Sequence, residues 1–290
     1  MMRRETIQAY LLLSPAVILL VAFTHWPAVG TLIDSFYSTP HGNRAAVSVG
    51  VDNYTDLLDD PVFLQALINN LWYGLVTIPA SVGLSLLMAL SVNRALPGRV
   101  LVRMAYFTPT ILPLIAVANI WLFFFTPDYG LLDQISLAFG FGRHNWLGEP
   151  ATALPAMMAV AIWKEAGFFM IFYLAALQTM PADLAEVGRL EGASRWLYFR
   201  RVTWPLLMPT TLFVIVNAVI NAFRLVDHVV VMTRGGPDNA TNLLLYHIYE
   251  TGFRFWDSAA AATLTVVLLA IMGILAGLVF AVLGRKAHYR

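Results

Sequence analysis

Polar and charged residues interrupt two long apolar stretches of the chain, and their chemistry suits the binding of a hydroxylated or charged solute. One stretch carries Trp163, Lys164 and Glu165, and the other carries a polar series at steps of three and four residues. Residues at these steps share one face of a helix. Because lipid offers no hydrogen bonds, such a face in a spanning helix must meet a partner or a water-filled cavity. We therefore expect one set of residues to line a solute path: Trp163, Lys164, Asn217, Asn221, Arg224, Asp227 and His228.

Structural interpretations of the same residues stay open at this point. Arg224 and Asp227 have i,i+3 spacing, which also allows an ion pair within one helix. Lys164 and Glu165 are adjacent, so their side chains leave a helix on different faces and are not expected to pair with each other.

Three asparagines, Asn69, Asn70 and Asn119, lie in other apolar stretches. Amide side chains in membrane helices commonly hydrogen-bond to neighbouring helices. We expect these three residues, and Trp121, to serve helix packing, and lining of the solute path stays open as the second interpretation.

The chain lacks the residue patterns of common catalytic and metal sites. It contains no cysteine, and neither Lys164 nor Lys286 follows a glycine, as the lysine of a phosphate-binding loop does. His247 and Glu250 come nearest to a zinc-protease motif, and further ligands are missing. We expect no catalytic residue, metal or cofactor in this chain.

The composition shows which elements must position these residues. Of the 290 residues, 59% are hydrophobic and 12% are charged, against about 45–50% and about 25% in soluble domains. This excludes a free-standing soluble enzyme or a nucleic-acid-binding protein and indicates a bilayer protein, in which a spanning helix takes about 20 apolar residues. We expect an all-α integral membrane domain over residues 1–290 with six transmembrane helices at 9–33, 64–92, 100–125, 154–177, 206–232 and 259–283.

Arginine and lysine are distributed unevenly between the two sides of this six-span arrangement. Loops rich in these residues stay on the cytoplasmic side. We therefore expect both termini and the loop at 181–205 to be cytoplasmic. One side holds Arg3, Arg4, Arg94, Arg99, Arg103, Arg189, Arg195, Arg200, Arg201, Arg285, Lys286 and Arg290, and the other holds only Arg44, Arg143, Arg234 and Arg254.

Two proline pairs with the same spacing occur in the third and fifth of these segments. Pro109 and Pro113 follow Arg103, as Pro205 and Pro209 follow Arg201. Transporters built from repeats often have broken helices at matching points. Membrane helices also tolerate proline without any repeat, so both interpretations stay open.

The loop at 181–205 is polar and compatible with two short helices joined at Gly192. Two amphipathic helices on the cytoplasmic side form a docking element for a soluble partner. Apolar residues repeat at helical spacing on both sides of the glycine: Leu184, Val187 and Leu190, then Trp196, Phe199 and Val202.

This loop resembles the EAA loop of permease subunits of ATP-binding-cassette importers. Glu186 is followed by Gly192 six residues later and then by Val202 and Pro205, as in that pattern. Glu191, Gly192 and Ala193 resemble the Asp-Gly-Ala of carbohydrate importers. The chain departs from the pattern at Val187 and Gly188, which replace alanines, and at Glu191 and Trp204, which replace Asp and Leu.

Other fragments are similar to carbohydrate and glycerol-phosphate permeases of the maltose-transporter type. They extend the resemblance over nearly the whole chain. The fragments are Trp26-Pro27, 50–54, Trp163-Lys164, 233–237 and 246–249.

The resemblance implies a type I importer permease architecture in a bacterial inner membrane. It implies a heterodimer with a second homologous permease, two ATPase subunits that bind ATP and Mg²⁺, and an extracytoplasmic solute-binding protein. Glu186 would contact a basic residue of the ATPase, and Gly192 would make the bend between the coupling helices. The implied ATPase-coupling set is Glu186, Glu191, Gly192, Ala193 and Pro205, and the implied solute is a sugar or a sugar-like compound, including glycerol phosphate or another anionic sugar derivative.

Two other functions compete with the importer interpretation. A stand-alone ion-coupled secondary carrier would relay protons through Lys164, Glu165 and Asp227, but it leaves the loop at 181–205 unexplained. The second is an intramembrane enzyme, but the chain lacks the zinc-protease motif that such an enzyme would need. We favour the importer permease.

Overall fold

The computed structural model describes residues 2–42, 44–93, 97–224 and 226–283. Arg94, Arg285, Lys286 and Arg290, which contribute to the charge asymmetry, lie outside the described residues. The chain forms two compact units: unit 1 comprises Met1–Pro61 with Ile248–Leu269, and unit 2 comprises Val62–His247 with Ala270–Arg290. Apart from two isolated β-bridges, the regular elements among the described residues are helical.

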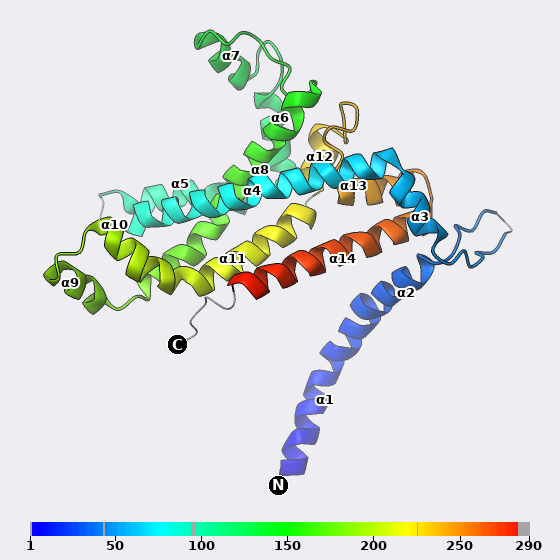
Figure 1. Ribbon diagram of the computed structural model, residues 1–290, viewed down its shortest axis with the longest axis horizontal. Helices are drawn as coiled ribbons and strands as arrows, with labels where there is room; N and C mark the ends of the chain where they lie inside the picture. Colours follow the sequence, from blue (N-terminus) through cyan, green and yellow to red (C-terminus); the bar gives the residue numbers. More distant parts are fainter. Residues whose placement is uncertain (1, 43, 94–96, 225, 284–290) are drawn as a thin grey trace. The chain divides into compact units, whose positions relative to one another are not determined.

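Unit 1 begins with one long apolar helical segment. It consists of α1 (Met2–Leu20), a π-helical turn η1 (Val21–His25) and α2 (Trp26–Asp34), and Figure 1 shows it as a continuous helix. Thr6–Asp34 is long and apolar enough to cross a membrane, and it includes the whole of the first predicted span.

The rest of unit 1 holds α3 (Asp52–Asp59), the π-helical turn η3 (Glu250–Arg254) and the start of α14 (Ser258–Leu283). Asp257 fixes the first turn of α14, because its carboxylate accepts the Ala260 N–H and the Thr39 hydroxyl. The α14 helix coincides with the sixth predicted span.

Three long helices build the core of unit 2. They are α4 (Pro61–Asn93), α8 (Pro150–Gln178) and α11 (Trp204–Arg224). Buried side chains from all three meet in one apolar cluster: Ala89, Val92, Phe169, Met170, Tyr173, Leu174, Leu177, Leu207, Val214 and Ala218. The second and fourth predicted spans thus lie within α4 and α8.

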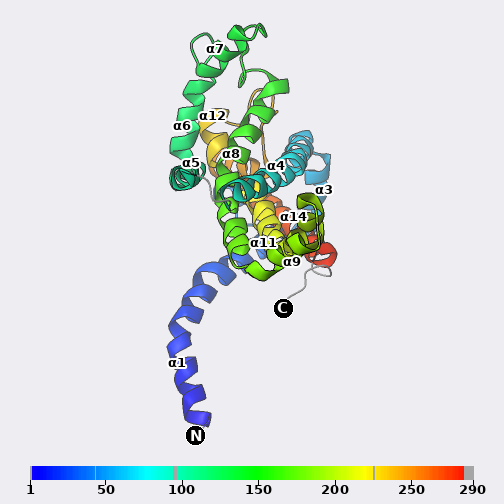
Figure 2. The ribbon, with the colours of Figure 1, turned by 90° about the vertical axis from the view of Figure 1, so that its left-hand side faces the viewer.

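The third predicted span, 100–125, is not one straight helix. It consists of α5 (Arg99–Ile111) and α6 (Leu114–Phe124), which are bent by 102°. Both ribbon views show the change of direction (Figures 1 and 2). Leu112 has extended backbone angles, as a residue before proline prefers, and Pro113 lies at the start of α6. Within the described part of the chain, five helical stretches are long and apolar enough to cross a membrane, and this bent pair makes six if it counts as one span.

The loop at 181–205 is shorter than expected, because its second helix runs directly into the fifth span. After α9 (Ala182–Leu190), the chain forms α10 (Arg195–Tyr198), a π-helical turn η2 (Phe199–Thr203) and α11 without a break. At the other end α11 stops at Arg224, and the short α12 (Asp227–Met232) follows. The predicted polar face from Asn217 to His228 is therefore divided between two helices.

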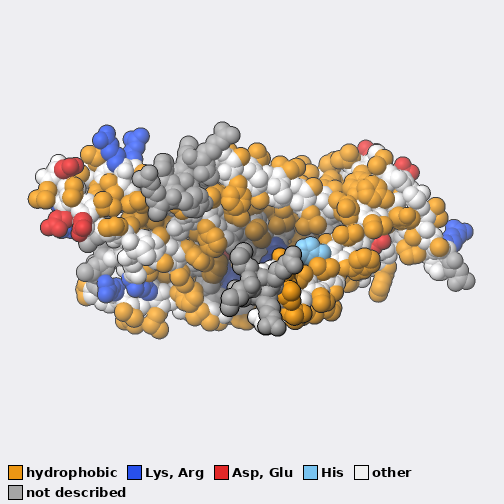
Figure 3. Space-filling model, turned by 90° about the horizontal axis from the view of Figure 1, so that it is seen from below, with side chains coloured by type: hydrophobic (Ala, Val, Ile, Leu, Met, Phe, Trp, Pro, Cys, Tyr) orange, Lys and Arg blue, Asp and Glu red, His pale blue; other side chains and the backbone are white. Residues whose placement is uncertain are grey.

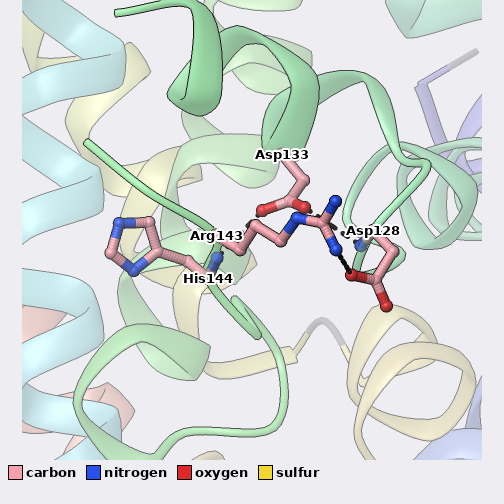
Figure 4. Close-up of polar contacts among 4 residues, drawn as sticks. All are labelled: Asp128, Asp133, Arg143 and His144. Atoms are coloured by element: carbon pink, nitrogen blue, oxygen red, sulfur yellow. Dashed lines mark hydrogen bonds and ion pairs between the residues drawn. The ribbon is translucent and has the colours of Figure 1, made fainter. Parts of the chain in front are cut away.

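Three short helices lie in loops where none was predicted. They are α3, described above, α7 (Leu131–Ala138) and α13 (Leu244–Tyr249). In the first turn of α7, the fully buried Asp133 has a carboxylate that accepts the backbone N–H groups of Asp128 and His144, at 3.0 and 2.9 Å. Figure 4 shows this carboxylate between the loop segments that carry Asp128 and His144, with Arg143 paired to Asp128 beside it. Asp133 therefore ties the two ends of this loop together.

Candidate functional site

A cavity of about 130 Å³ lies in unit 2 next to the break in the third span. Five helices contribute to its wall: α5, α6, α8, α11 and α12. Its lining residues are Thr110, Leu114, Val160, Ala161, Lys164, Glu165, Phe168, Asn221 and His228. Three of the seven predicted path residues, Lys164, Asn221 and His228, therefore converge here.

Lys164 projects from α8 toward the end of α5. Its ammonium group donates hydrogen bonds to the carbonyl oxygens of Pro109, at 2.9 Å, and Leu112, at 2.7 Å. In an unbroken helix the Pro109 carbonyl would accept the N–H of residue 113, but Pro113 has none. Lys164 thus supplies the donor that the proline lacks.

Glu165 and Asn221 face each other across the same cavity. The Glu165 carboxylate interacts with the Asn221 side-chain amide, which lies one helix away on α11. An ammonium, a carboxylate and an amide are the groups that bind hydroxyl and anionic groups of a solute. The cavity therefore has the chemistry of a polar-solute site.

His228 forms the α12 part of the wall and is almost fully buried. Its Nε2 lies 3.2 Å from the hydroxyl oxygen of Tyr73 on α4, and its Nδ1 has no hydrogen-bond partner among the described residues. Tyr73 thus fixes the ring from one side and leaves the other nitrogen available. No pattern in the sequence indicates this pairing, because Tyr73 lies 155 residues away.

Four predicted path residues lie elsewhere. Trp163 packs edge-on against Trp121, with ring centroids 5.5 Å apart. The Asn217 amide donates to the Phe213 carbonyl one turn back in its own helix. Arg224 and Asp227 are both exposed, and no ion pair joins these two described side chains.

Cavity residues that the sequence did not single out are mostly apolar or small. Thr110 and Leu114 flank the break, and Phe168 lies one turn beyond Lys164. Pro113 is the sequence feature that could have pointed to this cavity, since a proline in a span frees backbone groups that nearby polar side chains must satisfy.

Asn69 and Asn70 are buried and hold the loop after α12 against α4. Asn69 donates to the carbonyls of Asn239 and Asn242, and Asn70 accepts the Leu244 N–H. Among the described residues, Asn119 bonds only to a carbonyl of its own helix, that of Ile115. The packing role expected for Asn69 and Asn70 is confirmed.

The loop between α8 and α11 bends sharply at Gly192. This residue has a left-handed φ of 69°, and the amides of Gly192 and Ala193 donate to the carbonyls of Arg189 and Gly188. Such paired bonds are the Schellman motif, a common glycine-terminated helix end. Gly192 is thus a helix C-cap that also turns the chain.

Close packing holds α9 against α10 beyond this bend. A Cβ at Gly188 would lie 2.8 Å from the Tyr198 ring, so glycine leaves room for the tyrosine there. Glu186, Glu191 and Pro205 are exposed, whereas Ala193 is half-buried. Figure 3 shows arginine side chains gathered with acidic ones at the end of unit 2 that carries α9 and α10.

Comparison with known proteins identifies the class to which this fold and this loop belong. Residues 81–289 match the model of the binding-protein-dependent transport system inner membrane component. The chain belongs to this family. It is a multi-pass inner-membrane permease of an ATP-binding-cassette importer, and it works with a solute-binding protein. ATP is bound by a separate ATPase rather than by this permease, which is not itself an enzyme.

Individual relatives agree with this assignment. The chain is 31% identical to the sulfoquinovosyl glycerol transport system permease of Agrobacterium fabrum over 92% of its own length and 87% of the relative. It is 30% identical to the sn-glycerol-3-phosphate transport system permease of the same organism, over 97% of its own length and 96% of the relative. The predicted resemblance to carbohydrate and glycerol-phosphate permeases is thereby confirmed, and the ion-coupled carrier is set aside.

A solved structure supports the fold. The chain is similar to a chain from the crystal structure of a bacterial ATP-binding-cassette transporter involved in the import of the acidic polysaccharide alginate, with a TM-score of 0.85 and 22% identity. The match covers 97% of this chain and 96% of the other. The predicted all-α importer-permease fold is confirmed.

Proposed function

We propose that the chain forms half of the translocation path for a sugar or a sugar-like solute, including glycerol phosphate or another anionic sugar derivative. The observation that carries this proposal is the cavity beside the broken third span, where Lys164, Glu165 and Asn221 meet. Half-buried polar groups of both charges can bind hydroxyl groups and an anionic group together. The names of two relatives, for sulfoquinovosyl glycerol and sn-glycerol-3-phosphate, support solutes of this chemistry.

The remaining predicted path residues take part outside this cavity. Trp163 is 38% exposed and presents an aromatic face, which suits the apolar face of a sugar ring. Asn217 is half-buried, and Arg224 and Asp227 are exposed on the helices that carry Asn221 and His228. In our proposal they extend the path beyond the cavity wall, toward a second, homologous permease.

The loop with Gly192 is the proposed contact for two ATPase subunits. Glu186, Glu191 and Pro205 are exposed there, and Ala193 follows the bend. An exposed carboxylate such as Glu186 suits a basic groove on the partner surface. In this arrangement both chain termini and the loop are cytoplasmic, and the solute-binding protein delivers solute from the other side.

The experiment is ATP-driven uptake by the complete transporter in proteoliposomes, with glycerol 3-phosphate, sulfoquinovosyl glycerol and lactose as the tested solutes. We expect accumulation of at least one of them that needs ATP, the binding protein and the second permease. Glu186→Lys should abolish accumulation and weaken recovery of the ATPase, whereas Glu149→Gln, in a different loop, should change neither. Full uptake by Glu186→Lys would contradict the proposed coupling, and uptake without the binding protein would contradict the proposed path.

A further inference from the structure

We infer that Lys164 is a latch that holds the third span in its broken form and thereby shapes the cavity. It is a positioning residue, whose ammonium group replaces the backbone N–H that Pro113 lacks. This role does not require that Lys164 bind the solute. The consequence for transport rests on the proposed function, but the structural claim stands on contacts within unit 2.

The break in the third span leaves backbone hydrogen bonds unmade. The Pro109 carbonyl has lost its helical partner, and Leu112 has extended backbone angles. In a bilayer an unsatisfied carbonyl cannot turn to water, so each such group needs a protein donor. Lys164 supplies donors to both, at 2.9 and 2.7 Å, which are distances typical of charge-assisted hydrogen bonds. Two of the three ammonium protons are thus engaged.

The α5 helix is fixed against α8 beside Lys164. A Cβ at Gly167 would overlap the Tyr106 carbonyl oxygen, so the two backbones approach closely there. The Thr110 hydroxyl donates to the Lys164 carbonyl at 3.3 Å. These contacts set the end of α5 within reach of the Lys164 side chain.

The α6 helix is fixed separately. Its buried residues Val117 and Ala118 pack with Val160 of α8 and Met232 of α12. The break therefore lies between two anchored helices, and Lys164 reaches from α8 to the carbonyls at the junction. Thr110 and Leu114, which flank the break, both line the cavity, so the bend angle sets the cavity's shape.

The test is a distance measurement across the break by pulsed electron paramagnetic resonance on the purified permease complex, without solute. The chain has no cysteine, so spin labels can be attached at Met104→Cys in α5 and Phe123→Cys in α6, both exposed positions. From the 102° bend, these positions are about 18 Å apart, against about 28 Å in an unbroken helix at 1.5 Å per residue.

We expect Lys164→Met to broaden the distance distribution and shift it by several ångströms toward the longer value. Lys164→Arg, which keeps a charged donor, should retain the short distance. Glu165→Gln is the matched control, because it removes the adjacent charge without touching the two carbonyls. An unchanged distribution in Lys164→Met would overturn the inference.

The same substitution in a Pro113→Ala variant separates loss of the two hydrogen bonds from simple misfolding. Pro113→Ala restores a backbone N–H opposite the Pro109 carbonyl, so adding Lys164→Met there should change the distances little further. The inference is wrong if Lys164→Met changes the distance distribution as much in the Pro113→Ala background as it does in the wild-type chain. A Lys164→Met variant with unchanged distances but lost uptake of glycerol 3-phosphate would overturn the latch and leave the proposed path standing.

Discussion

Gly167 in α8 lies directly against the carbonyl group of Tyr106 in α5, so that a Cβ at this position would overlap the carbonyl oxygen. A backbone oxygen cannot move aside as a flexible side chain can. Glycine therefore sets the separation between α8 and the first half of the broken third span.

Gly167→Ala should accordingly separate these helices and destabilise unit 2. Overpacking of a close contact costs about 1–3 kcal/mol. The matched control is Gly83→Ala in α4, where a Cβ has nothing within 4 Å. We expect the thermal denaturation midpoint of the purified permease complex to fall in Gly167→Ala and to stay near wild type in Gly83→Ala. Equal midpoints for both variants would contradict the packing described here.

The fold was largely predictable from sequence because apolar length and positive charge decide which segments enter a bilayer. The two proline pairs show what apolar length and charge do not predict, which is whether a span is broken. Pro113 accompanies a 102° bend, whereas Pro205 and Pro209 lie within α11, which continues through them. The difference depends on which donor each freed carbonyl finds. Lys164 donates to the Pro109 carbonyl only because tertiary packing brings α8 beside α5.

The candidate site was predictable in part for the same reason. Lys164, Asn221 and His228 stand out as polar residues in apolar segments, and they do line one cavity. Helical spacing alone grouped Arg224 with them, but α11 ends at that residue. The Tyr73 hydroxyl beside His228 could not be found by spacing, because it belongs to a distant helix.

Asp133 should control the order of the loop between α6 and α8. In Asp133→Asn the amide nitrogen can no longer accept one of the two backbone N–H bonds, and a buried unsatisfied donor costs about 1–3 kcal/mol. We expect faster trypsin cleavage after the exposed Arg143, identified by mass spectrometry of the fragments. Glu149→Gln, an exposed carboxylate in the same loop, should cleave at the wild-type rate. Equal rates for the two variants would rule out this role of Asp133.

Gly192 should tolerate only residues that accept a left-handed backbone. Its φ is 69° and no other group lies near its absent Cβ, so strain is the sole cost of substitution. A β-branched residue there costs on the order of 1–2 kcal/mol, whereas asparagine is accepted at such helix ends. Gly192→Val should reduce ATPase co-purification and solute-stimulated hydrolysis, and Gly192→Asn should preserve both. Wild-type hydrolysis in Gly192→Val would show that the bend is not needed for coupling.

The charge asymmetry predicts that the loop with Arg195 is cytoplasmic and the loop with Phe141 is extracytoplasmic. Single cysteines at Arg195 and at Phe141, both exposed, can be labelled with a membrane-impermeant thiol reagent in intact spheroplasts. Phe141→Cys should react before lysis, and Arg195→Cys only after it. The reverse order of labelling would invert the proposed topology.

The cavity's part in transport is tested most directly by two asparagines on one helix. Asn221 lines the cavity and interacts with Glu165, whereas Asn217, one turn away, bonds to its own helix. The measurement is the initial rate of ATP-driven solute uptake by the reconstituted transporter, with co-purification of all subunits as the assembly control. Losing one hydrogen bond to a charged group costs about 1.5 kcal/mol, so Asn221→Leu should slow uptake roughly tenfold, whereas Asn217→Leu, which changes a side chain outside the cavity, should slow it much less. Undiminished uptake by a fully assembled Asn221→Leu transporter would contradict the assignment of this cavity to the solute path.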